Sequence, residues 1–170
     1  MHKVIGYGSL LSHKSLRETL PNKKFSLVII KGFKRIFNVI DSKDKSPDVL
    51  NVKKSTSSEL NGVLFAVNDK ELNTLKKRED DYNLEKVNYY DFRTGKLLGK
   101  ALICIDHSTT IDFHHKNPNK NYFILCREAA YHISKKFGQL WDNTTFTSSG
   151  EKISSWLKSH KDYDTISSKS

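Results

Sequence analysis

The stretch VIGYGSLL (residues 4–11) predicts a short apolar strand that runs into a glycine turn. A polar segment that can form a helix follows from Ser12 to Leu20 and ends before Pro21. Two glycines on either side of one aromatic residue allow the backbone to approach a neighbour closely. Successive peptide N–H groups in such a turn can point at one spot and hold an anion or a developing oxyanion. We therefore expect a ligand-binding loop, with an ordinary strand-to-helix turn as the alternative.

Three well-known glycine motifs do not fit this loop. A dinucleotide-binding fingerprint needs a third glycine where the chain has Leu11. A phosphate-binding loop needs glycine and lysine followed by serine or threonine, and the chain has no such run. A nucleophile elbow needs a glycine two residues after Ser9, and Leu11 stands there as well.

The chain has 170 residues, which predicts one domain with a core of its own. We expect this domain to span residues 1–160, with 161–170 as a polar tail. No apolar run is long enough to cross a bilayer, and the N-terminus does not resemble a signal peptide. Cys104 and Cys126 lie in apolar segments without zinc-like spacing, which favours reduced core thiols in a cytoplasmic protein.

The formal net charge is +10, which could attract nucleic acid or other anions. The lysines are scattered in pairs, and no arginine-rich block with interleaved aromatic residues is present. A solvated lysine surface is therefore expected, and neither nucleic acid nor a membrane is expected as a partner.

Turn and periodicity signals predict the remaining elements. Strands are expected at 25–40, as two strands or one strand bent at Gly32, and at 49–53, 60–67, 86–92 and 97–105, with a turn at 55–58. A capping box at Asn68 predicts one helix, and a longer helix is expected over 122–137, ended by Gly138. About six or seven strands with few helices between them predict an α+β fold, a mixed and mostly antiparallel sheet that can close into a barrel flanked by helices.

One carboxylate follows the apolar stripe of the first of these helices. Leu72 and Leu75 define the buried face, and Glu79 lies four residues beyond Leu75 on the same face. A carboxylate turned towards the core has a raised pKa, which suits a general base. The alternative is that the helix ends by Arg78 and Glu79 is a solvated end residue.

Three features of the chain come in the order found in one known family. They are the loop at residues 6–10, the segment Arg78-Glu79-x-x-Tyr82, and Tyr122 at the start of a helix. Together they resemble the γ-glutamylcyclotransferase superfamily, which includes AIG2-like proteins, over roughly residues 2–140. The resemblance implies a compact mixed barrel flanked by helices. It also implies cleavage of a γ-glutamyl amide by attack of the substrate's own α-amine, with release of 5-oxoproline and an amine.

The resemblance implies a role for each matched residue. Glu79 would be the catalytic base, and the backbone of the glycine loop would hold the substrate's α-carboxylate or the oxyanion. No metal and no cofactor are implied, and the expected partner is a small γ-glutamyl compound. The expected substrate-binding residues are Tyr7, Gly8, Ser9, Leu10, Tyr82 and Tyr122.

The chain also departs from the family pattern. Leu10 stands where one large branch has asparagine, and Asp80 and Asp81 follow the glutamate where glycine is common. Like charges close to a carboxylate raise its pKa and disfavour an anionic substrate group. A catalytically silent member of the fold, binding a small molecule, a protein or nucleic acid, is therefore the alternative function.

Two further enzyme hypotheses have less support. Histidines and an aspartate share one loop, but their spacing matches no common metal-binding motif. The cysteines have apolar neighbours, and burial raises a thiol pKa and makes it inert. The loop residues in question are His107, Asp112, His114 and His115.

Overall fold

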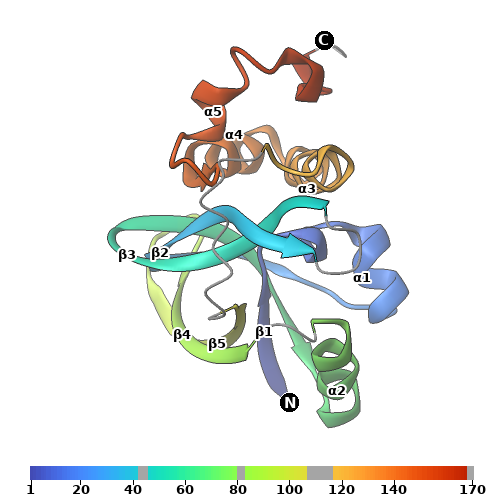
Figure 1. Cartoon of the computed structure of the whole chain (residues 1–170). Coiled ribbons are helices and arrows are strands. Elements are labelled where there is room, and N and C mark those ends of the chain that lie inside the picture. Colours follow the sequence, from blue (N-terminus) through green and yellow to red (C-terminus); the bar gives the residue numbers. More distant parts are fainter. Residues whose placement is uncertain (42–45, 80–82, 107–116, 168–170) are drawn as a thin grey trace.

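The computed structural model describes residues 1–41, 46–79, 83–106 and 117–167. Six strands form one mixed sheet in the order β3-β1-β5-β4-β2-β6, and a further pairing of β3 with β2 closes the sheet into a barrel-like ring (Figure 1). The strands are β1 (His2–Gly6), β2 (Ser26–Asp41), β3 (Ser46–Val67), β4 (Asn83–Asp91), β5 (Leu97–Ile105) and β6 (Thr145–Phe146).

The predicted fold class is confirmed. Strands β1 and β5 pair in parallel, as do β2 and β6, while β1–β3, β2–β3, β2–β4 and β4–β5 are antiparallel. The parallel β1–β5 pair places the glycine loop after β1 beside the end of β5, because parallel strands end at the same edge of a sheet. This edge is where the candidate site lies.

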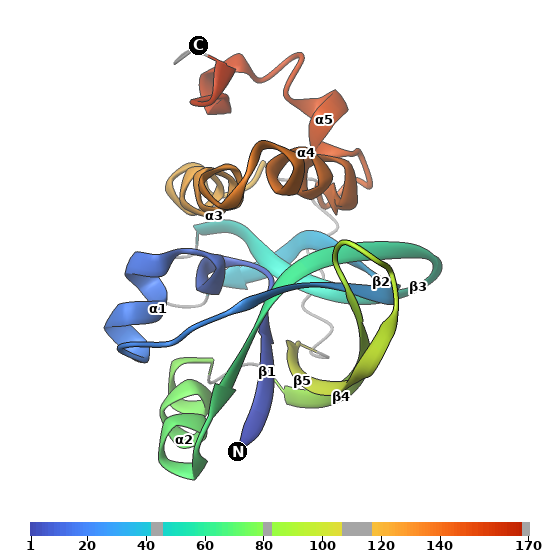
Figure 2. The ribbon, with the colours of Figure 1, turned by 180° about the vertical axis from the view of Figure 1, so that it is seen from behind.

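Helices cover the ring on two sides. Figure 1 and Figure 2 show α3, α4 and α5 stacked over β2 and β3, whereas α1 lies beside the ring and α2 lies at its far end near the N-terminus. The helices are α1 (His13–Thr19), α2 (Asp69–Arg78), α3 (Lys120–Ile133), α4 (Lys135–Thr144) and α5 (Ile153–Trp156), with 3-10 turns η1 (Ser9–Leu11) and η2 (Lys161–Tyr163). No helix among the described residues is long and apolar enough to cross a membrane.

The core of the ring is apolar and continuous with the layer under α3 and α4. Phe37 of β2 is fully buried and packs against Phe123 of α3 and Trp141 of α4. Such aromatic pairs contribute both buried area and specific edge-to-face contacts. The two cysteines are buried and unbridged, as their apolar neighbours predicted.

Several predicted elements are confirmed in detail. The bend expected in β2 is present, because Gly32 has a φ of +86° and the register with β3 shifts between Lys31 and Phe33. The Asn68 side chain accepts the N–H of Glu71, and the Glu71 carboxylate accepts the N–H of Asn68, which completes the capping box of α2.

Two local predictions were wrong. The turn expected at 55–58 lies inside β3, which pairs with β2 along most of its length. The helix expected over 122–137 ends at Ile133, because Ser134 is extended and its hydroxyl accepts the N–H of Phe137 to begin α4. Gly138 is therefore not a helix end. It lies inside α4, and the position is a glycine because the Tyr131 ring occupies the space that a Cβ would take.

The C-terminal residues are held against α3. Asp164 accepts a 2.8 Å ion-pair hydrogen bond from Arg127 of α3, and Tyr163 donates to the Pro118 carbonyl. The division of the chain into a domain over residues 1–160 and a tail over 161–170 stays a prediction.

Candidate active site

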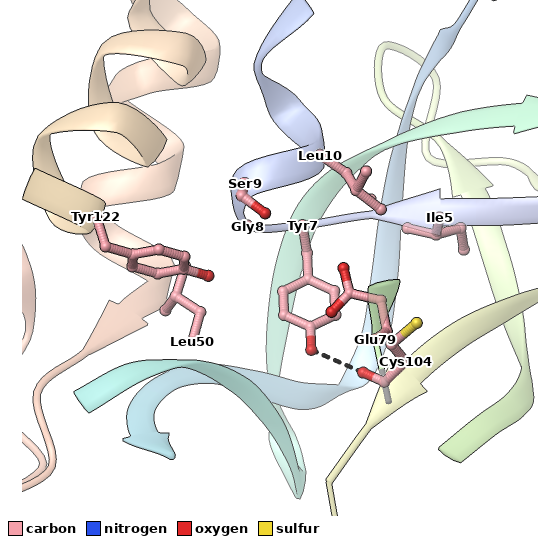
Figure 3. Close-up of a pocket in the computed structure, with 10 residues that line it drawn as sticks. Ile5, Tyr7, Gly8, Ser9, Leu10, Leu50, Glu79, Cys104 and Tyr122 are labelled. Carbon is pink, nitrogen blue, oxygen red and sulfur yellow. Dashed lines mark hydrogen bonds between the residues drawn. The ribbon is translucent and has the colours of Figure 1, made fainter. Parts of the chain in front are cut away.

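A small pocket lies where β1, β5, α2 and α3 approach one another. It encloses about 40 Å³. Figure 3 shows Tyr7, Glu79 and Cys104 on one side and Tyr122 with Leu50 on the other. Its lining residues are Ile5, Gly6, Tyr7, Gly8, Ser9, Leu10, Leu50, Glu79, Cys104 and Tyr122.

The glycine loop is fixed from within and from β5. The N–H groups of Leu11 and Ser12 donate to the carbonyls of Gly8 and Ser9, which closes the η1 turn. The buried Tyr7 side chain reaches across the pocket floor, and its hydroxyl donates a 2.7 Å hydrogen bond to the Cys104 carbonyl. The loop therefore has a defined position relative to β5.

A close approach explains why position 8 is a glycine. A Cβ placed on Gly8 would lie 2.9 Å from the Tyr122 hydroxyl, which is shorter than real Cβ contacts. Tyr122 lies in the first turn of α3, where the Asn119 side chain caps the helix by accepting the Tyr122 N–H. The start of α3 and the glycine loop thus face each other across the pocket.

Glu79 is the carboxylate of the pocket. Helix α2 ends at Arg78, as the alternative interpretation held, and Glu79 is its C-cap, with an N–H that donates to the Leu75 carbonyl. Its side chain is nevertheless only 22% exposed and points into the pocket (Figure 3). Burial raises the pKa of the Glu79 carboxyl, and the adjacent Arg78 partly counteracts this rise.

Neither cysteine thiol, of Cys104 at the pocket or of Cys126 in the core, is activated. Burial, with a contribution from the Glu79 charge, raises the pKa of the Cys104 thiol to about 12. Burial likewise raises the pKa of Cys126 to about 12. Both thiols are therefore protonated near neutral pH, in line with the apolar surroundings that argued against a cysteine nucleophile.

The pocket brings together all but one of the predicted site residues. Tyr7, Gly8, Ser9, Leu10, Glu79 and Tyr122 line it. Tyr82 lies outside the described residues, as do Asp80, Asp81 and the histidine loop at 107–116. Among the residues that the structure describes, no group of three or more histidine, cysteine or acidic side chains gathers as a metal site.

Four lining residues were not among the predicted site residues, and neither was Arg78, which contacts two of those that were. The four are Ile5, Gly6, Leu50 and Cys104. Leu50 reaches the pocket because β3 closes the ring with β2, which no local pattern announces. Cys104 is buried, as expected, and also lies at the pocket wall. Arg78 contacts both Ser9 and Glu79. The one sequence feature that could have indicated this role is its position directly before Glu79.

No family model and no curated protein sequence matches this chain. Solved structures do match it. A structure described as gamma-glutamyl cyclotransferase superposes with a TM-score of 0.66 at 18% identity, covering 93% of this chain and 98% of that one. A yeast gamma-glutamyl cyclotransferase specific to glutathione superposes with a TM-score of 0.62 at 14% identity, covering 96% and 97%. An uncharacterized protein from Homo sapiens gives a TM-score of 0.65 at 18% identity, covering 92% and 98%.

These matches identify the fold of the chain. The chain has a γ-glutamylcyclotransferase-like fold, with a mixed six-stranded ring and flanking helices. At these identities, the likeness establishes the fold and leaves the activity to be argued from the site.

Proposed function

We propose that this protein is a γ-glutamylcyclotransferase-type enzyme that converts a γ-glutamyl amide into 5-oxoproline and a free amine. The observation that carries the proposal is the meeting, in one pocket, of a partly buried carboxylate with a raised pKa and a glycine loop. The fold shared with a yeast enzyme described as acting on glutathione supports the same substrate class.

The chemistry requires a base. The α-amine of a γ-glutamyl compound is largely protonated near neutral pH, because such amines have pKa values of about 7.7–8.0. The ionised Glu79 takes one proton from this amine, and the nitrogen attacks the γ-carbonyl carbon. When the γ-carbon to nitrogen bond breaks, Glu79 returns this proton to the leaving nitrogen. The attacking nitrogen loses its second proton to the freed Glu79 carboxylate and from there to solvent, which leaves the lactam N–H of 5-oxoproline and a neutral amine. A burial-raised pKa suits both proton transfers.

The glycine loop stabilises the charge that develops on the γ-carbonyl oxygen. The Leu11 and Ser12 N–H groups already close the turn. The donors to the γ-carbonyl oxygen are therefore N–H groups of residues 7–10. Tyr122 and Tyr7 line the opposite walls and orient the glutamyl group for ring closure. Such orientation can be worth roughly 7–11 kcal/mol of the barrier.

The size of the pocket limits what can bind. Its 40 Å³ is far below the roughly 300–1,000 Å³ of pockets that hold drug-sized ligands. A substrate therefore enters only after the lining side chains move apart, and the proposed chemistry requires its glutamyl part to lie beside Glu79.

The test is product analysis on a panel of γ-glutamyl compounds: glutathione, γ-glutamyl dipeptides and a γ-glutamyl-lysine isopeptide. Each is paired with its α-N-acetyl derivative, which cannot cyclise through a free amine. Release of 5-oxoproline from a free-amine compound alone supports the proposal. Release of glutamate from the free-amine compound and of N-acetylglutamate from its derivative would indicate hydrolysis instead. Saturable binding without turnover would favour a catalytically silent binding module.

A further inference from the structure

Arg78 joins three parts of the molecule at the pocket. Its Nη2 donates a 3.0 Å hydrogen bond to Ser9 Oγ in the glycine loop, and its Nη1 donates to Thr19 Oγ1 at the end of α1. Its Nε lies 3.5 Å from Glu79 Oε1. One side chain therefore connects α1, the glycine loop and the carboxylate that follows α2.

Only arginine can make this set of contacts. Its planar fork presents N–H donors in fixed directions, whereas lysine carries one compact charge on a flexible stem. Arg78 is 26% exposed, so its contacts are partly shielded from water. Hydrogen bonds with a charged partner are also shorter and stronger than neutral ones.

The contact with Arg78 also sets the role of the Ser9 hydroxyl. A serine hydroxyl has one proton to donate and two lone pairs to accept with. Within the part of the chain that the structure describes, the bond from Arg78 is the one hydrogen bond of this hydroxyl, which acts there as the acceptor. Its proton therefore remains available to a ligand in the pocket that Ser9 lines.

We propose that Arg78 is a positioning residue, which holds the Glu79 carboxylate towards the pocket and turns the Ser9 hydroxyl into a donor for the substrate. The part concerning substrate rests on the function proposed above. The part concerning Glu79 is independent of turnover.

Among the described residues, three further titratable side chains line the pocket beside Glu79. Tyr7, Tyr122 and Cys104 line the same pocket, and the pKa of Cys104 is raised to about 12. Among the described residues, Arg78 is the charged group that acts on Glu79, and it lowers the pKa that burial raises. Removal of the guanidinium therefore has one expected sign: the pKa of Glu79 rises further.

The experiment is a carbon-13 NMR titration of glutamate-labelled protein, with the Glu79 signal assigned from Glu79→Gln. We expect the Glu79 titration to move to higher pH in Arg78→Met and to stay close to the wild-type position in Arg78→Lys. Lys77→Met is the matched control, because it removes a charge from the same end of α2 but from an exposed side chain. An unchanged titration in folded Arg78→Met would overturn the proposal. If Arg78→Met does not fold, Arg78→Gln takes its place.

Kinetics supply the second measurement. We expect kcat/KM near pH 7 to fall roughly ten- to a hundredfold in Arg78→Met, as for loss of a charged hydrogen bond, with its acidic limb moved to higher pH. In Arg78→Lys we expect the acidic limb of the pH profile to stay in place while kcat/KM still falls. In Ser9→Ala we expect kcat/KM to fall without a shift of this limb. A uniform loss in Arg78→Met with no movement of the limb would indicate a merely structural role. Failure of the wild type to turn over any substrate would refute the proposed function alone, since the titration needs no substrate.

Discussion

The Tyr7 hydroxyl donates a 2.7 Å hydrogen bond to the Cys104 carbonyl, and this bond joins the loop after β1 to the end of β5. Tyr7→Phe removes the bond and keeps the ring. We expect the free energy of unfolding to fall by about 1 kcal/mol. Activity should fall about tenfold or more, because the loop N–H groups lose their fixed position. Urea unfolding and steady-state kinetics measure the two effects.

Tyr89→Phe is the matched control for this change. Tyr89 is a buried tyrosine of β4 whose hydroxyl contacts Lys3 and does not line the pocket. We expect it to leave the activity unchanged. Equal loss of activity in both variants would mean that Tyr7 acts through overall stability alone.

The approach of Tyr122 to Gly8 gives a second prediction. In Gly8→Ala the new methyl group would lie 2.9 Å from the Tyr122 hydroxyl, so the tyrosine must move and the pocket changes shape. We expect kcat/KM to fall about tenfold or more. In a Tyr122→Phe background the clashing atom is absent, and the same substitution should cost less. An equal cost in both backgrounds would show that this contact does not matter.

The pKa of Glu79 makes stability depend on pH. Because burial raises this pKa above 4.5, the folded protein binds the proton more tightly than the unfolded chain does. The Glu79 carboxyl therefore does not lower the stability of the fold at a pH below its pKa in the unfolded chain. It destabilises the fold as the pH rises through its pKa in the folded protein. Glu79→Gln should therefore be more stable than wild type at about pH 7, with the difference closing at about pH 4.

Urea unfolding at both pH values measures this difference. Glu18→Gln, an exposed carboxylate of α1, is the control and should change neither value. A Glu79→Gln variant that is less stable than wild type at about pH 7 would mean that the carboxylate supports the fold.

The pKa shift of Asp164 is opposite in sign to that of Glu79. Burial would raise its pKa, but hydrogen bonds from the Ser167 backbone and from Arg127 outweigh burial and lower the pKa to about 2. Its contribution to stability is present above the unfolded pKa of 3.8 and is lost as pH falls towards 2. Asp164→Asn should lose about 1–2 kcal/mol at neutral pH and match wild type near the acid end.

Activity separates this C-terminal contact from the site. Asp164 and Arg127 do not line the pocket, so Asp164→Asn should keep wild-type kinetics where it is folded. A large loss of kcat in the folded variant would show that the C-terminal segment acts on the pocket.

The sequence predicted what depends on local patterns. Strand β5 begins and ends where expected, because it is mostly apolar and follows the turn at Gly95. The stripe through Leu72 and Leu75 placed Glu79 on the inner side, even though helix α2 ends one residue earlier. That end redirects the backbone without removing the side chain from the pocket.

The remaining features depend on tertiary contacts. Leu50 reaches the pocket through the closure of the ring by β3 and β2, which involves residues far apart in the chain. Gly138 has the local signature of a helix end, but the Tyr131 ring from α3 requires a glycine there. A single sequence contains no information on such packing partners until the fold brings them together.

In the proposed mechanism, Glu79 transfers the proton in the cyclisation. The most direct test compares the rate of 5-oxoproline release by wild type, Glu79→Gln and Glu18→Gln, using the best compound of the γ-glutamyl panel. We predict a loss of about 10²–10⁴-fold for Glu79→Gln, with the Glu18→Gln control unchanged. A folded Glu79→Gln variant that releases 5-oxoproline at the wild-type rate would contradict the claim.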